Sequence, residues 1–225
     1  MAAPDGIDAR LPLVTGEIVL GGRSWRVTAV QNQDALVEAM DSLEHMPYGF
    51  LLWEAAVGLA QLLCEQPERA AGKRILELGC GVGLPGMVAR WLGAEVRQTD
   101  HQQGALNLAE KNALQNGITG IERFLADWRD WNHTERYDVL LGADILYERA
   151  MHAHLERIFR ENLASGGTLL IGDPVRPQAL EFTADLERKG WRMHLDTRMV
   201  RLHEEGRENR PVEVALIIGT PCERR

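Results

Sequence analysis

From residue 73 onward, short apolar runs typical of β-strands alternate with longer segments whose apolar residues recur at helical spacing. A crossover helix is the usual way to return a chain to the same edge of a parallel sheet, so this alternation predicts a parallel α/β sheet. Strands are expected at 74–79, 95–100 and 168–174, and a strand together with its exit at each of 121–128 and 138–148. Helices are expected at 85–94, 105–117, 180–191 and 152–167, the last with a glycine stop. Two further β-rich runs, 191–201 and 212–220, have no helix between them and are expected to form a hairpin with one antiparallel strand.

The first 46 residues are expected to form an N-terminal extension, and residues 47–225 one larger domain. Two β-rich runs around Gly21-Gly22 predict a hairpin over 17–30, and apolar spacing predicts helices over 34–44 and 50–63. The predicted fold class is therefore α/β, with a doubly wound, seven-stranded, mostly parallel sheet that ends in an antiparallel hairpin.

Composition and charge argue against several functional classes. The 225 residues carry a formal net charge of −8, whereas tight binding to a nucleic-acid backbone needs a basic surface, so no nucleic-acid partner is expected. Three scattered cysteines without a CxxC pair argue against a disulfide framework and favour a cytoplasmic location. The histidines show no metal-ligand spacing, and no apolar run approaches the roughly 20 residues of a membrane span, so neither a metal nor a membrane is expected.

The first strand of the alternation runs directly into four glycines. Read from Gly81, the segment spells Gly81-x-Gly83-x-x-Gly86, the fingerprint of dinucleotide-binding loops. Read from Glu77, it spells Glu-x-Gly-x-Gly-x-Gly, with Gly79 as its first glycine, a pattern that suits S-adenosylmethionine. Glycines allow a ligand to approach the backbone closely because no Cβ intervenes. Both interpretations predict a nucleotide-like ligand, but they imply different chemistry.

Acidic residues follow the other predicted strands at the carboxyl edge of the sheet, where ligands bind in open α/β folds. Asp100 lies nineteen residues after Gly81, where a carboxylate accepts hydrogen bonds from the ribose hydroxyls of either cofactor. His101, directly after it, is a further candidate for a cofactor contact, the alternative being an exposed histidine in the first turn of a helix. Asp127 and Asp144 also follow apolar runs.

Two features favour S-adenosylmethionine. Glu77 lies at the buried end of its strand, where a carboxylate would repel a pyrophosphate but suits a ligand that carries sulfonium and ammonium groups. Asp127 and Trp128 follow the third strand of the alternation, where an acid accepts from an adenine amino group while an aromatic ring packs on the base. The simpler interpretation of this pair, a helix-capping aspartate and a core tryptophan, stays open.

Taken together, these motifs resemble those of the seven-β-strand methyltransferases, and more narrowly of their protein-lysine methyltransferase group. That group carries a W-D/E-A-A-like motif, matched at 53–56, and a D-x-x-Y motif, matched by Asp144 and Tyr147. The resemblance covers roughly residues 47–175. The stretch 172–177, GDPVRP, is similar to that of the branch that methylates the electron-transfer flavoprotein β-subunit, with Val175 where that branch usually has glycine.

The resemblance implies an S-adenosylmethionine-dependent N-methyltransferase whose acceptor is a protein lysine or, alternatively, a small-molecule amine. Asp144 would stabilise the positive charge that develops on the acceptor nitrogen, and Tyr147 would shape the pocket or accept a hydrogen bond. Trp53 and Ala143 would contact the cofactor. The structural alternatives are a helix-capping role for Asp144 and core positions for Tyr147 and Trp53.

Two functions outside this class stay open from the sequence. An NAD(P)-dependent oxidoreductase would use the fingerprint from Gly81 to Gly86, and a non-catalytic binder would keep only the fold. A nucleic-acid amino-methyltransferase is disfavoured because the segment after the fourth strand lacks the prolines of the Asn/Asp-Pro-Pro-Tyr/Phe motif.

Overall fold

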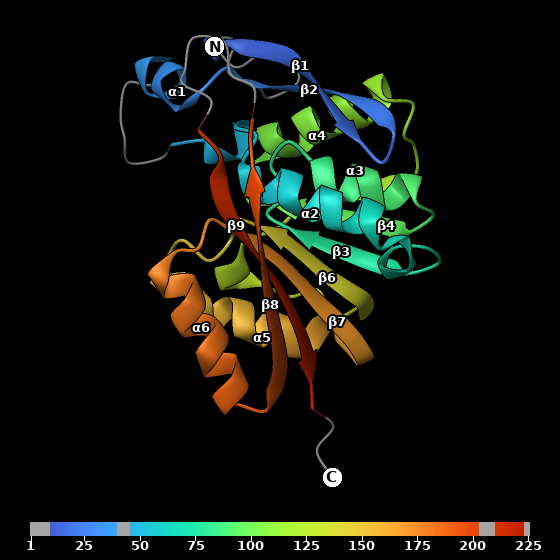
Figure 1. The fold of residues 1–225 in the computed structure, drawn as a ribbon, viewed down its shortest axis with the longest axis vertical. Coiled ribbons are helices and arrows are strands. Elements are labelled where there is room, and N and C mark those ends of the chain that lie inside the picture. The colour runs from blue at the N-terminus through green and yellow to red at the C-terminus, as the bar shows by residue number, and fades with distance from the viewer. Residues whose placement is uncertain (1–9, 40–45, 203–209, 223–225) are drawn as a thin grey trace.

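The computed structural model describes residues 10–39, 46–202 and 210–222. Seven of its strands pair in the order β5-β4-β3-β6-β7-β9-β8, and within this sheet β9 runs antiparallel to the other six strands (Figure 1). The predicted fold class is confirmed. The strands are β3 (Arg74–Leu78), β4 (Glu95–Asp100), β5 (Ile121–Leu125), β6 (Tyr137–Ala143), β7 (Leu163–Asp173), β8 (Trp191–Val200) and β9 (Val212–Pro221).

Helices cover both faces of this sheet because each has one apolar face that it buries against the strands. One face carries α2 (Glu54–Glu65), α3 (Leu84–Trp91) and α4 (Gln103–Gln115), which contribute Leu59, Met87 and Leu108 to one core cluster. The other face carries α5 (His152–Asn162) and α6 (Pro177–Arg188), whose Phe159 and Phe182 belong to a second cluster. Short 3₁₀ helices lie at η1 (Tyr48–Phe50), η2 (Pro67–Arg69), η3 (Trp128–Asp130) and η4 (Arg149–Met151).

The order of the strands reverses between β3 and β6. From β3 the chain proceeds through β4 to β5 on one side and then returns to place β6 on the other side of β3. The segments that leave the carboxyl ends of β3 and β6 therefore diverge, which opens the crevice where ligands bind in such sheets. The glycine loop leaves β3 and Asp144 follows β6, so the topology brings the two together.

A two-stranded hairpin lies outside the main sheet, against α4 (Figure 1). It pairs β1 (Leu13–Leu20) with β2 (Arg23–Val30) around Gly21 and Gly22, whose φ angles are 59° and 74°. Two positive φ angles are what a type I′ hairpin turn requires, which explains the two glycines. The helix predicted over 34–44 appears as α1 (Gln33–Ala39), and its remaining residues lie outside those that the structure describes.

Two predicted helices were too long. The helix expected at 152–167 ends at Asn162, whose side chain accepts from the Trp131 indole N–H and donates to two backbone carbonyls. Leu163 is extended and pairs with Tyr137, and residues 164–167 form an irregularity in β7. The helix expected over 50–63 begins only at Glu54, because Leu51 and Trp53 have extended backbones.

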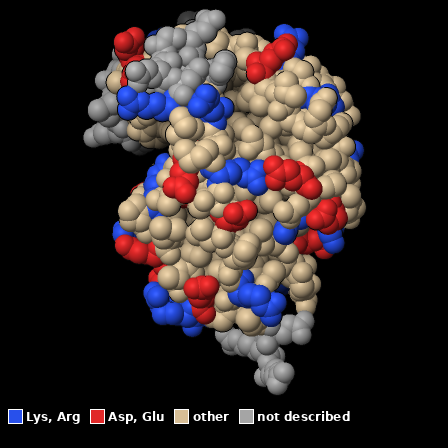
Figure 2. Space-filling model, viewed as in Figure 1, with Lys and Arg blue, Asp and Glu red and all other residues tan. Residues whose placement is uncertain are grey.

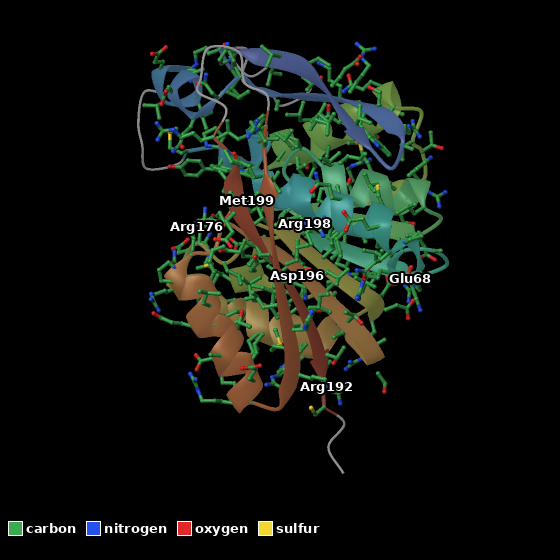
Figure 3. The ribbon with its side chains drawn as sticks, viewed as in Figure 1. Glu68, Arg176, Arg192, Asp196, Arg198 and Met199 are labelled. Carbon is green, nitrogen blue, oxygen red and sulfur yellow. The ribbon has the colours of Figure 1, made fainter. Side chains whose placement is uncertain are left out.

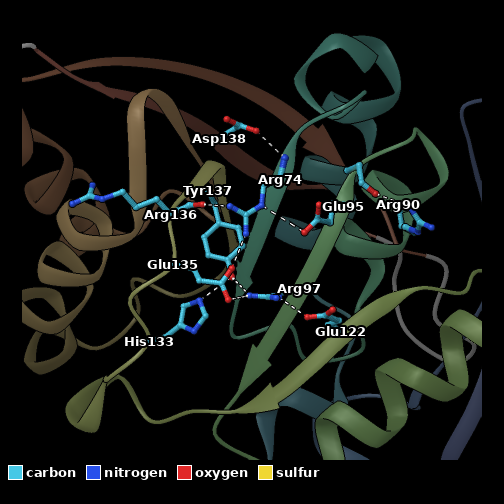
Figure 4. Close-up of polar contacts among 11 residues, drawn as sticks. Arg74, Arg90, Glu95, Arg97, Glu122, His133, Glu135, Arg136, Tyr137 and Asp138 are labelled. Carbon is cyan, nitrogen blue, oxygen red and sulfur yellow. Dashed lines mark hydrogen bonds and ion pairs between the residues drawn. The ribbon is translucent and has the colours of Figure 1, made fainter.

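A polar network lies at the amino-terminal end of β3, on the opposite side from the crevice (Figure 4). Glu135 pairs with both Arg74 and Arg97, and the Arg97 guanidinium donates to the Tyr137 hydroxyl at 3.1 Å. His133 Nε2 lies 2.8 Å from the same hydroxyl, so this histidine belongs to a network that joins strands.

The charged side chains on the face that Figure 2 displays are mixed in sign. The basic residues near the C-terminal strands illustrate this, because Arg198 pairs with Glu65, Lys189 with Glu156 and Arg188 with Asp185. Among the residues described, no helix combines the length and the apolar character needed to cross a membrane.

Candidate active site

A cavity of about 240 Å³ opens beyond the carboxyl ends of β3, β4 and β6. Ten of the twelve predicted site residues line it: Trp53, Gly79, Gly81, Asp100, His101, Asp127, Trp128, Ala143, Asp144 and Tyr147. The two that do not are Glu77 and Gly83. The structure therefore brings together residues that are up to 94 positions apart in the sequence, from Trp53 to Tyr147.

Close packing explains the first two glycines of the loop. Gly79 and Gly81 have φ angles of 61° and 51°, in the left-handed region that glycine adopts without steric cost. A Cβ on Gly81 would lie 3.0 Å from the carbonyl oxygen of Gly49, and a Cβ on Gly79 would lie 3.2 Å from the Trp128 ring. The loop backbone consequently forms one wall of the cavity without side chains of its own at these positions.

Asp100 ends β4 at the edge of this wall and is only 5% exposed. Its carboxylate accepts a hydrogen bond from the Gly81 N–H at 3.1 Å and another from the Gln102 N–H at 3.0 Å. A carboxylate has about four acceptor positions, so these two bonds orient it and leave it able to accept from a ligand. His101 is exposed, and its bond to Asp100 raises the pKa of the imidazole.

Glu77 lies beneath the glycine loop and not against the cavity. It is fully buried, accepts from Gln98 Nε2 at 2.7 Å and accepts from the Gly86 N–H in the first turn of α3. Burial raises its pKa to about 7. A Cβ on Gly86 would lie 2.4 Å from this carboxylate, and one on Gly83 would lie 2.8 Å from Ala109, so both glycines serve internal packing.

This arrangement bears on the dinucleotide interpretation. The N–H groups at the start of a helix are the usual partners of a pyrophosphate. Here a carboxylate of the protein already holds the Gly86 N–H, at the point where the third glycine of the dinucleotide fingerprint falls.

Asp127 and Trp128 follow β5 and line the same cavity as Asp144. Asp127 accepts from the Arg129 backbone N–H at 2.9 Å and from its guanidinium at 2.6 Å, and these bonds lower the pKa of Asp127 to about 2. The Trp128 ring packs against Gly79 and is half-buried. Arg129 also lines the cavity, so it lies beside any ligand that reaches Asp127.

Asp144 forms the centre of a charged cluster. Its backbone has a left-handed φ of 57°, and its carboxylate accepts two hydrogen bonds from the Arg176 guanidinium, one of them at 3.1 Å. Arg176 is the residue directly before α6 (Figure 3). It also lies 3.3 Å from Asp173, whose burial raises the pKa of its carboxyl group. Two carboxylates thus share one guanidinium at the edge of the cavity.

Aromatic side chains form the open side of the cavity. Trp53 lies 6.3 Å from Tyr48, ring centre to ring centre, and its indole N–H donates to the Tyr48 carbonyl at 3.1 Å. Tyr147 is 46% exposed, and partial burial together with nearby carboxylates raises the pKa of its phenol. The Tyr147 hydroxyl therefore keeps its proton at neutral pH and is able to donate or accept a hydrogen bond.

Sequence reasoning missed Tyr48, Gly49, Arg129 and Arg176, which contact the cavity or its acids. The motif at 172–177 contains Arg176, but the sequence did not indicate that this arginine pairs with Asp144. An arginine two positions after Asp127 was visible as a possible local partner, although such spacing is common on protein surfaces.

A family model described as lysine methyltransferase matches residues 32–188. The chain is 36% identical over 129 residues to the protein N-lysine methyltransferase METTL21A of Danio rerio, covering 54% of this chain and 58% of that protein. It is 31% identical over 134 residues to the electron transfer flavoprotein beta subunit lysine methyltransferase of Danio rerio, covering 59% of this chain and 52% of that protein.

A third relative is named for a different acceptor. The histidine protein methyltransferase 1 homolog of Dictyostelium discoideum is 32% identical over 125 residues, covering 53% of this chain and 40% of that protein. The chain thus spans about half the length of the curated relatives it matches. Among solved structures, the ribosomal protein L11 methylase of Lactobacillus delbrueckii has the same fold, with a TM-score of 0.56, 20% identity, and coverage of 75% of this chain and 79% of that one.

Proposed function

Because this chain belongs to the lysine methyltransferase family, we propose that it transfers a methyl group from S-adenosylmethionine to a lysine side chain of a protein. The observation that carries the proposal is the single cavity in which the glycine loop, Asp100 and the Asp144–Tyr147 motif meet. S-adenosylmethionine supplies an electrophilic methyl group attached to a sulfonium sulfur.

The residues at the cavity fit such a cofactor. Asp100 retains acceptor positions for two ribose hydroxyls after binding the N–H groups of Gly81 and Gln102. Gly79 and Gly81 line the cavity without side chains, so a ligand is able to approach their backbone closely. The half-buried Trp128 ring offers a flat apolar surface for a base.

The same residues do not suit a dinucleotide. The helix N–H that a pyrophosphate would use is held by Glu77, and an additional negative charge would face this buried carboxylate. The oxidoreductase alternative therefore receives no support from the site.

The acceptor side of the reaction requires a neutral amine. A free lysine has a pKa near 10.4 and is protonated at neutral pH, so the site must release that proton to water and hold the amine in line with the methyl group. As the nitrogen accepts the methyl group it becomes cationic. The Asp144 carboxylate lines the cavity, where it would accept hydrogen bonds from the N–H groups of this nitrogen and stabilise the charge. Preorganisation by Arg176 fixes the carboxylate before the acceptor arrives.

The cluster of Asp144, Asp173 and Arg176 also supports a cationic acceptor. Two carboxylates and one guanidinium leave the cluster acidic when both acids are ionised, so a positively charged lysine is attracted to it. The aromatic rings of Tyr48, Trp53 and Tyr147 would surround the aliphatic stem of such a side chain.

The test is a methyl-transfer assay with tritiated S-adenosylmethionine and a cellular lysate. We expect label in one or a few protein bands, and acid hydrolysis of these bands should release methylated lysine. Release of methylarginine or methylhistidine would contradict the lysine assignment while leaving methyl transfer intact. Label confined to small molecules would contradict a protein acceptor and favour the small-molecule amine.

A further inference from the structure

Helix α4 presents two asparagines, one turn apart, to the neighbouring strand β2. Asn112 accepts from the Thr28 N–H at 2.8 Å and donates to the Thr28 carbonyl at 2.9 Å. Asn116 accepts from the Arg26 N–H at 2.9 Å and donates to the Arg26 carbonyl at 2.6 Å. Four residues of helix advance about 6 Å and two residues of strand about 6.7 Å, so the two spacings match. Each amide pairs with one strand residue as a neighbouring strand would.

Asn112 makes one contact that Asn116 lacks. Its second amide hydrogen is donated to the carbonyl oxygen of Val82 at 2.9 Å. Val82 lies in the glycine loop between Gly81 and Gly83, whose φ angles are 51° and 83°, and it lines the cavity. Asn112 thus joins the hairpin to the loop that forms a wall of the proposed cofactor site.

The hydrogen bonds of Asn112 are complete, and they fix its orientation. Its side-chain oxygen accepts from Thr28 and from Gln115 Nε2 at 2.8 Å, and both of its amide hydrogens are donated to carbonyls. The side chain is fully buried. Removing it would leave the Val82 carbonyl without this partner inside the protein, and an unpaired buried polar group is costly enough to drive a local rearrangement.

Two of the hydrogen bonds that hold the loop are made at neighbouring residues. Asp100 accepts from the Gly81 N–H at 3.1 Å, and Asn112 donates to the carbonyl of the next residue, Val82. A shift at Val82 would therefore be transmitted to the peptide that positions Gly81 against Asp100. The hairpin on the other side of Asn112 lies outside residues 32–188, the range that matches the family model.

We propose that Asn112 is a positioning residue for the cofactor loop, and that through it the N-terminal hairpin is energetically coupled to cofactor binding. The coupling rests on the proposed cofactor site. The hairpin at 13–30 would then contribute to cofactor affinity although it does not contact the cofactor itself. Because coupling between two sites is reciprocal, ordering the loop with a ligand must also stabilise the hairpin.

The first test compares Asn112→Ala with the matched control Asn116→Ala, using titration calorimetry with S-adenosylhomocysteine. Both variants lose an amide that binds the hairpin, but only the first loses the bond to the loop. We expect the Kd to rise by about tenfold or more for Asn112→Ala, which corresponds to about 1.4 kcal/mol, and to stay within about twofold for Asn116→Ala. Asn112→Asp, which keeps the acceptor and loses both donors, should weaken binding as Asn112→Ala does.

Three outcomes are distinguishable. An unchanged Kd for Asn112→Ala would overturn the coupling. An equal loss of affinity in the Asn112 and Asn116 variants would overturn the positioning role of Asn112, since loosening of the hairpin, and not loss of the bond to Val82, would then be the cause. Failure of the unmodified protein to bind S-adenosylhomocysteine would refute the proposed function itself.

A second measurement needs no variant. Hydrogen exchange of the unmodified protein, with and without S-adenosylhomocysteine, should show slower exchange in peptides that contain Thr28 as well as in those that contain residues 79–83. Peptides from α6 serve as the reference for regions that do not contact the loop. Protection of the loop with no change in the hairpin relative to α6 would contradict the proposal.

Discussion

At the scale of single residues, two acids of the site carry arginine partners that hold them in place. The Asp127 carboxylate accepts hydrogen bonds from Arg129 and the Asp144 carboxylate from Arg176, while Asp100 is oriented by backbone N–H groups. Asp100 therefore remains the most available acceptor for a neutral hydroxyl. In the proposed function, Asp144 is the acid preorganised for an incoming cation, which would share or replace the guanidinium.

Replacing Asp144 with alanine should separate catalysis from cofactor binding. The carboxylate is proposed to act on the charge that develops at the acceptor, so its loss should lower kcat by at least about tenfold, the range expected for an interaction made mainly in the transition state. The Kd for S-adenosylhomocysteine should stay within about threefold. Glu181→Gln, which removes an exposed acid on α6 that pairs with Arg149, is the control and should leave both quantities unchanged. An equal loss of binding and turnover in Asp144→Ala would instead assign Asp144 to the cofactor or to folding.

Glu77 should make the stability of the protein depend on pH. Burial raises its pKa from about 4.5 to about 7, so the folded protein retains a proton that the unfolded chain releases. The free energy of unfolding should therefore fall as pH rises through this interval, by up to about 3 kcal/mol, with the full cost present above pH 7.

Glu77→Gln removes this one titration while keeping the shape of the side chain. In urea unfolding at pH 5, 6, 7 and 8, the stability of the variant relative to the unmodified protein should increase from pH 5 to pH 7 and then level off. Parallel pH profiles for the two proteins would mean that Glu77 is ionised in the folded state without cost.

The partners of the acids could not be predicted from the sequence for a physical reason. The sequence indicated which acids follow strands, because strand ends are encoded in the local apolar pattern. Whether Arg176 reaches Asp144 depends on the turn between β7 and α6, in which Val175 has a left-handed φ of 59°. Nothing in local propensity favours that conformation for a β-branched residue.

At the scale of elements, this turn stores backbone strain. A left-handed conformation costs a residue with a Cβ roughly 1–2 kcal/mol. Val175→Gly and Val175→Ala both remove the apolar side chain, but only glycine relieves the backbone. At ordinary positions alanine is the more stable of the two by about 0.5–1 kcal/mol. Here we expect the glycine variant to be more stable than the alanine variant by about 1 kcal/mol in urea unfolding. An alanine variant that is the more stable of the two would show that the turn carries no such strain.

The boundaries of elements were predictable where capping is local and not where tertiary contacts decide. The hairpin turn at Gly21-Gly22 and the strand that precedes the glycine loop follow from local sequence. The end of α5 does not, because the side chain of its last residue, Asn162, bonds Trp131 and backbone carbonyls that come from elsewhere in the chain. Local sequence places the end of the helix only at Gly166 and Gly167, the glycine stop.

At the scale of the whole molecule, the order of the strands creates the site. The alternation of strands and helices and the final hairpin predicted the sheet, and the ends of its strands predicted which residues meet at the crevice. The position of the N-terminal hairpin against α4 was not predictable. The hairpin is held there in part by two asparagines that look like ordinary polar residues in the sequence, and in part by Trp25, which packs on Trp91.

The central claim, that this crevice binds S-adenosylmethionine, is tested most directly by titration calorimetry of the purified protein with S-adenosylhomocysteine and, separately, with NADH. We predict saturable binding of S-adenosylhomocysteine alone. Asp100→Ala should weaken this binding by about tenfold or more, since hydrogen bonds to a charged group contribute about 1.5–3 kcal/mol. The control is Asp130→Ala, which removes an acid that does not line the cavity and should leave the Kd unchanged. Binding of NADH in place of S-adenosylhomocysteine, or an Asp100→Ala variant that binds as tightly as the unmodified protein, would contradict the account.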